Sequence, residues 1–152
     1  MPDIFISFSS ADEKLARFVH AHLKKEEIDA FLANVSVAPG ERWSPTILNA
    51  LKSSSWVLFL ASRAACASSW VQQELGGALL LNKKVVPVIW DMPPKELPGW
   101  IQQFQALNLA GATREDVEAH MTEIAKRIKT SKAQGLVVIG LVLAALLAYG
   151  SS

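Results

Sequence analysis

The sequence predicts an α/β domain in which helices cover both faces of a parallel sheet. Two observations predict it: short runs rich in β-branched and aromatic residues alternate with runs of helical period, and the connections between them are short. One strand-like run, 56–61, is apolar at every position, which is typical of a strand buried on both faces. With 152 residues, the chain is long enough for one domain with a substantial core and a short additional segment.

The first half of the chain contains three of the predicted strands. Apolar residues recur at helical spacing between the first two strands, and either Ser10 or Asp12 can cap this helix. A loop containing proline and glycine, 34–43, follows the second strand. We therefore expect strands at 3–8, 28–33 and 56–61 and helices at 11–25 and 44–52.

The second half continues the alternation. A helix is expected at 68–79, followed by a strand at 84–90 and a proline-rich loop at 91–99. A weak fifth strand at 106–110 precedes an amphipathic helix at 113–129. Thr113 can cap this last helix, and Asp116 occupies the third position of a capping box.

The composition argues against several classes of protein. The formal net charge is +1, so no strong positive charge favours nucleic acid as the main partner. The single cysteine cannot form a disulfide within the chain, and no secretion signal precedes the first strand, which indicates a cytosolic domain. The three histidines lie on helix-like segments without a second ligand at metal spacing, so we expect no metal site.

One acidic residue in the helix at 68–79 stands out. Ser69 and Gln72 fit a capping box at the helix start, but Glu74 lies beyond the first turn, where a carboxylate helps less as a dipole partner. Glu74 follows Trp70 by one helical turn and lies at the edge of an apolar stripe. It is therefore either an ordinary solvated glutamate or a charge placed beside the core for a chemical purpose.

Four segments in a fixed order resemble a known family. "DIFISFSSADE", "APGERWSPTILNALKSSSWVLFLAS", "SSWVQQEL" and "KVVPVIW" look like a Toll/interleukin-1 receptor (TIR) domain of the bacterial type, over about 3–129. This resemblance implies a flavodoxin-like sheet of five parallel strands with helices on both faces. It also implies cleavage of NAD as a substrate without a further cofactor, assembly with other TIR domains, and signalling in prokaryotic antiviral defence.

The resemblance also implies a set of site residues. The catalytic glutamate of the family lies in a Trp-x-x-x-Glu pattern, which here is Trp70 to Glu74. A carboxylate suits this reaction, because positive charge develops on the ribose as the nicotinamide bond breaks. Some members of the family place a cation near the position of Ser9, which this chain lacks, so Arg42 or Arg63 is a candidate to contact the pyrophosphate. The expected substrate-binding residues are Phe8, Ser9, Phe31, Arg42, Trp43 and Trp70.

Several functions fit the resemblance. We expect an NAD glycohydrolase, a hydrolase that breaks the nicotinamide–ribose bond and is activated by self-association. The alternatives are a cyclase that makes a cyclic ADP-ribose signal, a non-catalytic adaptor that acts by TIR–TIR assembly and, less favoured, a base-exchange enzyme on the same fold. The glutamate and tryptophan favour an enzyme, since a scaffold would not require a carboxylate at this site.

The C-terminal segment has a different composition. Residues 135–150 carry no charge and follow a basic cluster at 126–132, so we expect a TIR domain at 1–130 and an apolar helix at 131–152. We predict that 135–149 is a single-pass membrane anchor that leaves the TIR domain in the cytoplasm. The alternative is a helix buried between subunits of a homo-oligomer.

Overall fold

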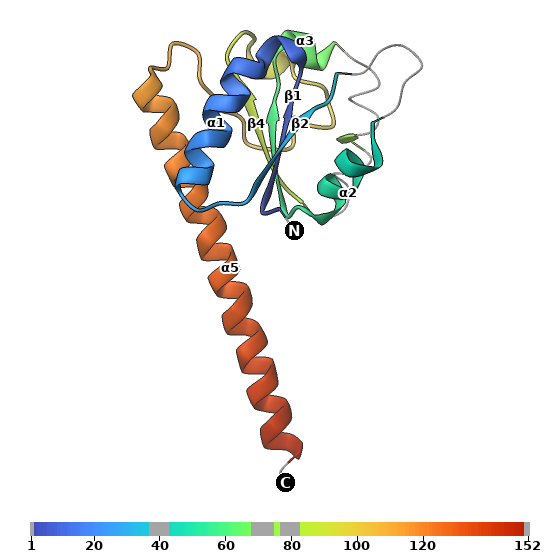
Figure 1. Cartoon of the computed structure of the whole chain (residues 1–152), viewed down its shortest axis with the longest axis vertical. Coiled ribbons are helices and arrows are strands. Elements are labelled where there is room, and N and C mark those ends of the chain that lie inside the picture. Colours follow the sequence, from blue (N-terminus) through green and yellow to red (C-terminus); the bar gives the residue numbers. More distant parts are fainter. Residues whose placement is uncertain (1, 37–42, 68–74, 77–82, 151–152) are drawn as a thin grey trace.

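The computed structural model describes residues 2–36, 43–67, 75–76 and 83–150, and for residues 135–139 and 149–150 it describes the backbone alone. A five-stranded parallel sheet forms the centre of the described part, with strand order β2-β1-β3-β4-β5 (Figure 1). The strands are β1 (Ile4–Phe8), β2 (Ala30–Asn34), β3 (Trp56–Leu60), β4 (Lys84–Ile89) and β5 (Leu107–Asn108). All four strand pairings are parallel, as the sequence predicts.

Helices cover both faces of this sheet. They are α1 (Glu13–Lys25), α2 (Pro45–Ser53), α3 (Arg63–Cys66) and α5 (Arg114–Gly150), with short 3-10 turns η1 (Ser10–Asp12) and η2 (Pro94–Glu96). Apolar residues of α1 and α5 pack on one face of the sheet. Apolar residues of α2, α3 and the segment after β4 pack on the other face. The predicted α/β architecture is therefore confirmed.

The helix ends follow local sequence signals. Ser44 caps α2, because its hydroxyl accepts a hydrogen bond from the backbone N–H of Ile47. Thr113 and Asp116 form the predicted capping box, in which each backbone N–H bonds to the other side chain, at 3.0 and 3.1 Å. Glu27 has a positive φ of 64°, which turns the chain out of α1 toward β2.

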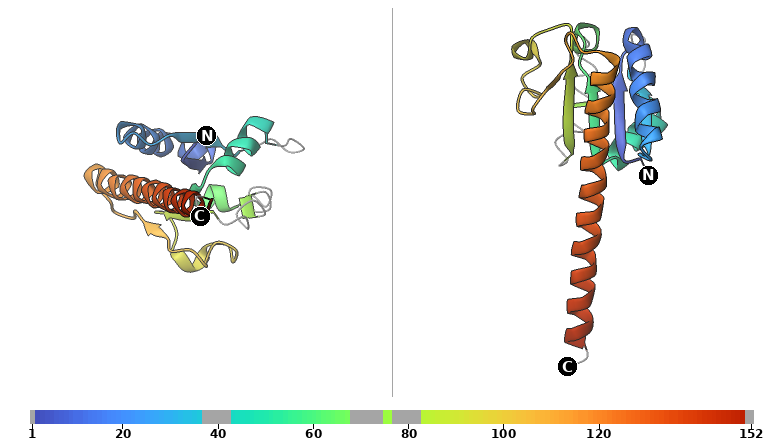
Figure 2. Two further views of the ribbon diagram at one scale, coloured as in Figure 1. Left: turned by 90° about the horizontal axis from the view of Figure 1, so that it is seen from below. Right: turned by 90° about the vertical axis from the view of Figure 1, so that its left-hand side faces the viewer.

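The last helix differs from its prediction. The structure contains one continuous helix, α5, of 37 residues instead of two separate segments. This helix leaves the body of the domain at the amino ends of the strands, where Lys132 pairs with Asp3 at 3.0 Å. Its last part projects beyond the rest of the molecule (Figures 1 and 2). The projecting part lies at the opposite end of the sheet from α3 (Figure 1).

The predicted membrane anchor at 135–149 is wrong. Among the residues that the structure describes, no helix is long and apolar enough to cross a membrane. The expected membrane partner and the expected single-pass membrane location depended on this anchor, so neither is supported.

Candidate functional site

The carboxyl ends of the first strands form a polar edge of the sheet. In parallel α/β sheets, ligands bind at this edge. The carboxyl ends of β1, β2 and β3 here lead into Ser9, Asn34 and Ser62, and Asp91 follows β4 closely. The backbone N–H of Val35 donates to the carbonyl of Phe8 at 2.9 Å, which keeps the ends of β1 and β2 together.

Hydrogen bonds join the segments after β1 and β2. The Asn34 side-chain amide donates to the Ser10 hydroxyl at 3.1 Å, and its amide oxygen accepts from the Ser36 N–H at 3.0 Å. The Ser36 hydroxyl in turn accepts from the Ser10 N–H at 3.0 Å. This closed set of bonds fixes two neighbouring segments that lie 24 to 26 residues apart in the sequence.

Two predicted substrate residues lie at the end of β1. Phe8 is only 4 % exposed and packs in the cluster formed with α1 and α5. Ser9 is also buried, and its hydroxyl donates to the Asp12 carboxylate at 2.7 Å. The ring and the hydroxyl are therefore engaged within the protein, and the backbone carbonyls of Phe8 and Ser9 accept hydrogen bonds from Val35 and Asp12.

Two others, Phe31 and Trp43, pack on the opposite face of the sheet. Phe31 stacks on Phe5, with ring centroids 5.9 Å apart and an interplanar angle of 12°. Trp43 is 3 % exposed, and its indole N–H donates to the carbonyl of Val35 at 3.1 Å. The structure therefore brings Phe31 and Trp43 to one apolar cluster and places Phe8 in another.

The remaining predicted residues, Arg42, Trp70 and Glu74, lie outside the described residues. The described neighbours of this segment are informative. Leu75, which follows Glu74 directly, is fully buried in the cluster that contains Trp43. Ala65 in α3 belongs to the same cluster. The chain on either side of 68–74 is therefore anchored in the core cluster that also contains Trp43 and against which Phe31 packs.

Arg63, the alternative pyrophosphate residue, has partners within the protein. Its guanidinium pairs with Glu96 at 3.0 Å and also donates to the backbone carbonyl of Asp91 at 3.0 Å. The Arg63 backbone N–H donates to the Asp91 carboxylate. Arg63 therefore ties the start of α3 to the segment after β4, and binding a phosphate would compete with these contacts.

The thiol of Cys66 lies in the same helix. Burial raises its pKa to about 11, and the negative charge of Asp91 acts in the same direction. The thiol is therefore protonated at neutral pH and does not fit the role of a nucleophile at this edge.

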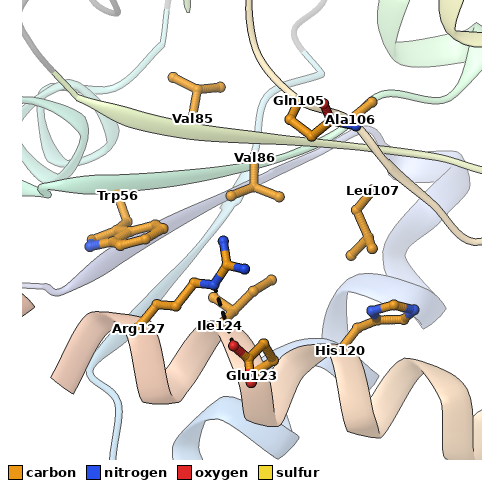
Figure 3. A pocket seen from close by; sticks show the side chains of 10 residues that line it. All are labelled: Trp56, Val85, Val86, Gln105, Ala106, Leu107, His120, Glu123, Ile124 and Arg127. Carbon is orange, nitrogen blue, oxygen red and sulfur yellow. Dashed lines mark hydrogen bonds and ion pairs between the residues drawn. The ribbon is translucent and has the colours of Figure 1, made fainter. Parts of the chain in front are cut away.

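A separate pocket of about 340 Å³ opens between α5 and strands β3 to β5 (Figure 3). Trp56, Val86 and Ile124 form apolar walls, and the side chains of Glu123 and Arg127 lie together on α5, with Arg127 Nε 3.5 Å from Glu123 Oε1 (Figure 3). None of the predicted site residues that the structure describes lines this pocket. Across the described ranges, no cluster of His, Cys, Asp or Glu could hold a metal ion.

Sequence reasoning missed the links between segments. Asp12 was considered only as a possible helix cap, but it makes no capping bond and accepts hydrogen bonds from Ser9 and Ser62 instead. Its spacing from Ser9 was a usable signal, because a serine three residues before an aspartate can bond to it locally. Nothing in the sequence indicated Ser62, which lies 50 residues away.

Comparison with known proteins identifies related sequences. A family model described as the TIR domain matches residues 4–130. The probable 2′ cyclic ADP-D-ribose synthase BdTIR of Brachypodium distachyon is 27 % identical over 97 residues, which cover 62 % of this chain and 43 % of that protein. The chain therefore spans less than half the length of this relative.

Solved structures share the fold at low sequence identity. The TIR domain of the Toll-related receptor TRR-2 from Hydra magnipapillata aligns with a TM-score of 0.63 at 15 % identity, covering 83 % of this chain and 99 % of that one. A diflavin flavoprotein A3 from Nostoc sp. aligns with a TM-score of 0.64 at 13 % identity, covering 87 % and 96 %. The flavodoxin-like arrangement of the sheet is therefore confirmed.

Proposed function

Because this chain belongs to the TIR domain family, we propose that it is an NAD-processing enzyme that cleaves the bond between nicotinamide and ribose. The observation that carries this proposal is the pair Trp70 and Glu74. Glu74 directly precedes Leu75, which is fully buried in the cluster that contains Trp43. Because Leu75 is fixed in the core, the neighbouring Glu74 carboxylate is suited to stabilise a positive charge that develops at a fixed position.

The chemistry requires little beyond such a charge. The C1′–N bond breaks with its electron pair moving to the nicotinamide nitrogen, which neutralises a cationic leaving group without an acid. Positive charge then develops on the ribose ring, as in glycoside hydrolysis, and the Glu74 carboxylate stabilises it electrostatically. Water adds to C1′ and loses a proton, which gives ADP-ribose. Glu74 is thus proposed as the catalytic residue.

The other proposed site residues contribute in different ways. Phe31 is half-buried, so part of its ring is available to a nicotinamide or adenine ring at the surface. The rings of Phe8 and Trp43 are nearly inaccessible, so we propose that they shape the site from beneath. We propose that Ser9 presents its backbone to the substrate and that Trp70 and Arg42 contact the nicotinamide end and the pyrophosphate.

A cyclase is the second candidate function, because the relative from Brachypodium distachyon is described as a probable 2′ cyclic ADP-D-ribose synthase. The first step is the same in both reactions. In the cyclase, a hydroxyl of the same ADP-ribose unit replaces water as the nucleophile at C1′ and loses its proton. Access of water to the ribose therefore decides between the two products.

Self-association is part of the proposal. TIR domains commonly assemble with one another. A single domain of this size can supply only part of a closed pocket, and we propose that a neighbouring copy over the loop 34–43 excludes water from it. We therefore propose a homo-oligomer as the active form, with specific activity that rises with protein concentration.

The test is incubation of the purified chain with NAD, followed by chromatographic separation of the products. Release of nicotinamide with ADP-ribose supports the glycohydrolase, whereas nicotinamide with a cyclic product supports the cyclase. If NAD remains intact over a concentration series that includes the assembled form, the enzyme proposal is rejected, and the adaptor function remains.

A further inference from the structure

The carboxylate of Asp12 joins two segments that are distant in the sequence. Although Asp12 directly precedes α1, its side chain makes no capping bond to that helix. Instead, its Oδ2 atom accepts hydrogen bonds from the hydroxyls of Ser9, at 2.7 Å, and Ser62. One carboxylate oxygen therefore serves both the segment after β1 and the segment after β3.

Both serines depend on this acceptor. Ser9 is 7 % exposed and Ser62 is 2 % exposed, so water cannot readily replace Asp12 as their partner. A buried hydroxyl without an acceptor is costly, and a hydrogen bond to an ionised carboxylate is stronger than one between neutral groups. The link is therefore a stable part of the fold rather than a surface contact.

Ser62 carries the link into α3. Its hydroxyl oxygen accepts a hydrogen bond from the backbone N–H of Ala65 at 3.1 Å and so caps the helix, while its proton points to Asp12. Ala65 is buried in the core cluster that also contains Leu75. Through Ser62, Asp12 therefore helps to fix the first turn of α3, which precedes Glu74 in the chain.

We propose that Asp12 is a positioning residue of the candidate active site, which sets the start of α3 against the segment after β1. The proposal rests on the proposed function. Asp12 does not touch the substrate in this role: it acts through Ser9, proposed to lie at the substrate, and through Ser62, at the start of the segment that bears the proposed catalytic carboxylate. A displacement of about 1 Å between reacting groups can reduce a rate by about 100-fold.

The enzymatic test compares Asp12→Ala with Asp12→Asn and with the control Glu13→Gln. Glu13 is the adjacent acidic residue, but it is exposed and pairs only with Arg17 in the described part, at 2.8 Å. We expect Asp12→Ala to lower kcat for NAD by at least 10-fold with a smaller change in KM. Asp12→Asn keeps an oxygen acceptor and should recover most of that loss, and Glu13→Gln should match the wild type.

A second comparison tests whether Asp12 acts through Ser62. Because both substitutions break the same link, the kcat loss of the Asp12→Ala/Ser62→Ala double variant should be clearly smaller than the product of the two single losses; the cap that Ser62 makes to Ala65 is lost in addition only through Ser62→Ala. Losses that multiply, or an Asp12→Ala enzyme with wild-type kcat, overturn the proposal. A folded Asp12→Ala protein that loses thermal stability but keeps kcat shows a structural role only and also overturns it.

One readout does not need activity. Hydrogen exchange at the Ala65 amide, followed by NMR, reports on the cap that Ser62 makes. We expect the Ala65 amide to exchange at least 10-fold faster in Asp12→Ala than in Glu13→Gln. Unchanged exchange rejects the positioning role, even if the wild-type protein processes NAD. Absence of NAD processing by the wild type, with faster exchange in Asp12→Ala, rejects only the proposed function and the catalytic consequence of the link.

Discussion

Trp43 donates its indole N–H to the backbone carbonyl of Val35 over 3.1 Å, and the Trp43 side chain is almost completely buried. Val35 directly follows β2 and is itself fully buried. The bond satisfies a buried carbonyl just beyond the end of β2, which is the edge strand of the described sheet. It therefore holds the segment after β2 against the core beneath the candidate site.

We predict that Trp43→Phe destabilises the protein by about 1–3 kcal/mol, because the Val35 carbonyl loses its donor while it remains buried. The matched control is Trp100→Phe. The Trp100 indole nitrogen is also buried, but it has no hydrogen-bond partner among the described residues, so the same loss of ring size should cost less. Urea denaturation of both variants measures the difference. Equal losses would show that the hydrogen bond contributes nothing.

The strands could be predicted from the sequence because their apolar runs are short and end in polar residues. β3 was predicted to within one residue, since a strand buried on both faces is apolar throughout. β2 was placed two residues early, because Ile28 is apolar but lies in the turn after α1, where its N–H bonds to the Leu23 carbonyl. A buried apolar residue in a turn therefore extends the apolar run that predicts the strand.

The candidate site was less accessible to sequence reasoning. A bond between Asp12 and Ser62 depends on β1 and β3 being neighbours in the sheet, and the local sequence around either residue does not show that order. The continuity of α5 was missed because the change from a charged to an apolar sequence at 135 resembles a boundary between elements. The backbone hydrogen bonds of a helix continue through a change from charged to apolar side chains when no proline or capping residue interrupts them.

Glu74→Gln should abolish most of the activity. The substitution preserves the size of the side chain but removes its charge, so loss of electrostatic stabilisation is expected to reduce the rate by about 100-fold or more. Nicotinamide release at saturating NAD measures the effect. Glu123→Gln, which removes an exposed carboxylate from α5, is the control and should retain wild-type activity. A folded Glu74→Gln protein with full activity would reject the proposed catalytic residue.

The Cys66 thiol should be unreactive in the native protein. Its pKa of about 11, raised first by burial and then by Asp91, leaves only about one thiolate per thousand molecules at pH 8. We expect iodoacetamide to label it about 100-fold more slowly than in 8 M urea, where an ordinary pKa of about 8.5 applies. The native rate should rise about tenfold per pH unit up to that pKa, and Asp91→Asn should increase it. Equal labelling rates in buffer and in urea would contradict this prediction.

Asp116 should contribute stability that depends on pH. Hydrogen bonding to Thr113, first through its backbone N–H and then through its side chain, lowers the pKa of the Asp116 carboxyl in the folded state. A lowered pKa stabilises the fold above the unfolded-state pKa of about 3.9, and this contribution is lost as the pH falls through the folded-state value. The difference in Tm between wild type and Asp116→Asn should therefore be largest at neutral pH and shrink below pH 4. A difference that stays constant from pH 7 to pH 2 would refute the linkage.

The projecting end of α5 should affect association rather than folding. Five large apolar residues on this end of the helix are described as 53 to 75 % exposed: Leu141, Val142, Leu143, Leu146 and Leu147. In the part of α5 whose side chains are described, ion pairs and hydrogen bonds to the body, such as those of Lys132 with Asp3 and of Ser131 with Lys84, precede this segment. A chain that ends after Ala133 should therefore keep its free energy of unfolding to within about 0.5 kcal/mol.

Exposed apolar surface of this kind favours burial against another copy, so the full chain should sediment as a larger species than the shortened one at the same concentration. Sedimentation velocity of the two chains measures this, and urea denaturation confirms that both are folded. Full-length Leu143→Lys combined with Leu147→Lys is the control for helix length and should behave as the shortened chain does. If the full chain remains monomeric throughout the concentration range, the projecting helix does not mediate self-association. A loss of several kcal/mol on shortening would instead show that this segment packs on the domain.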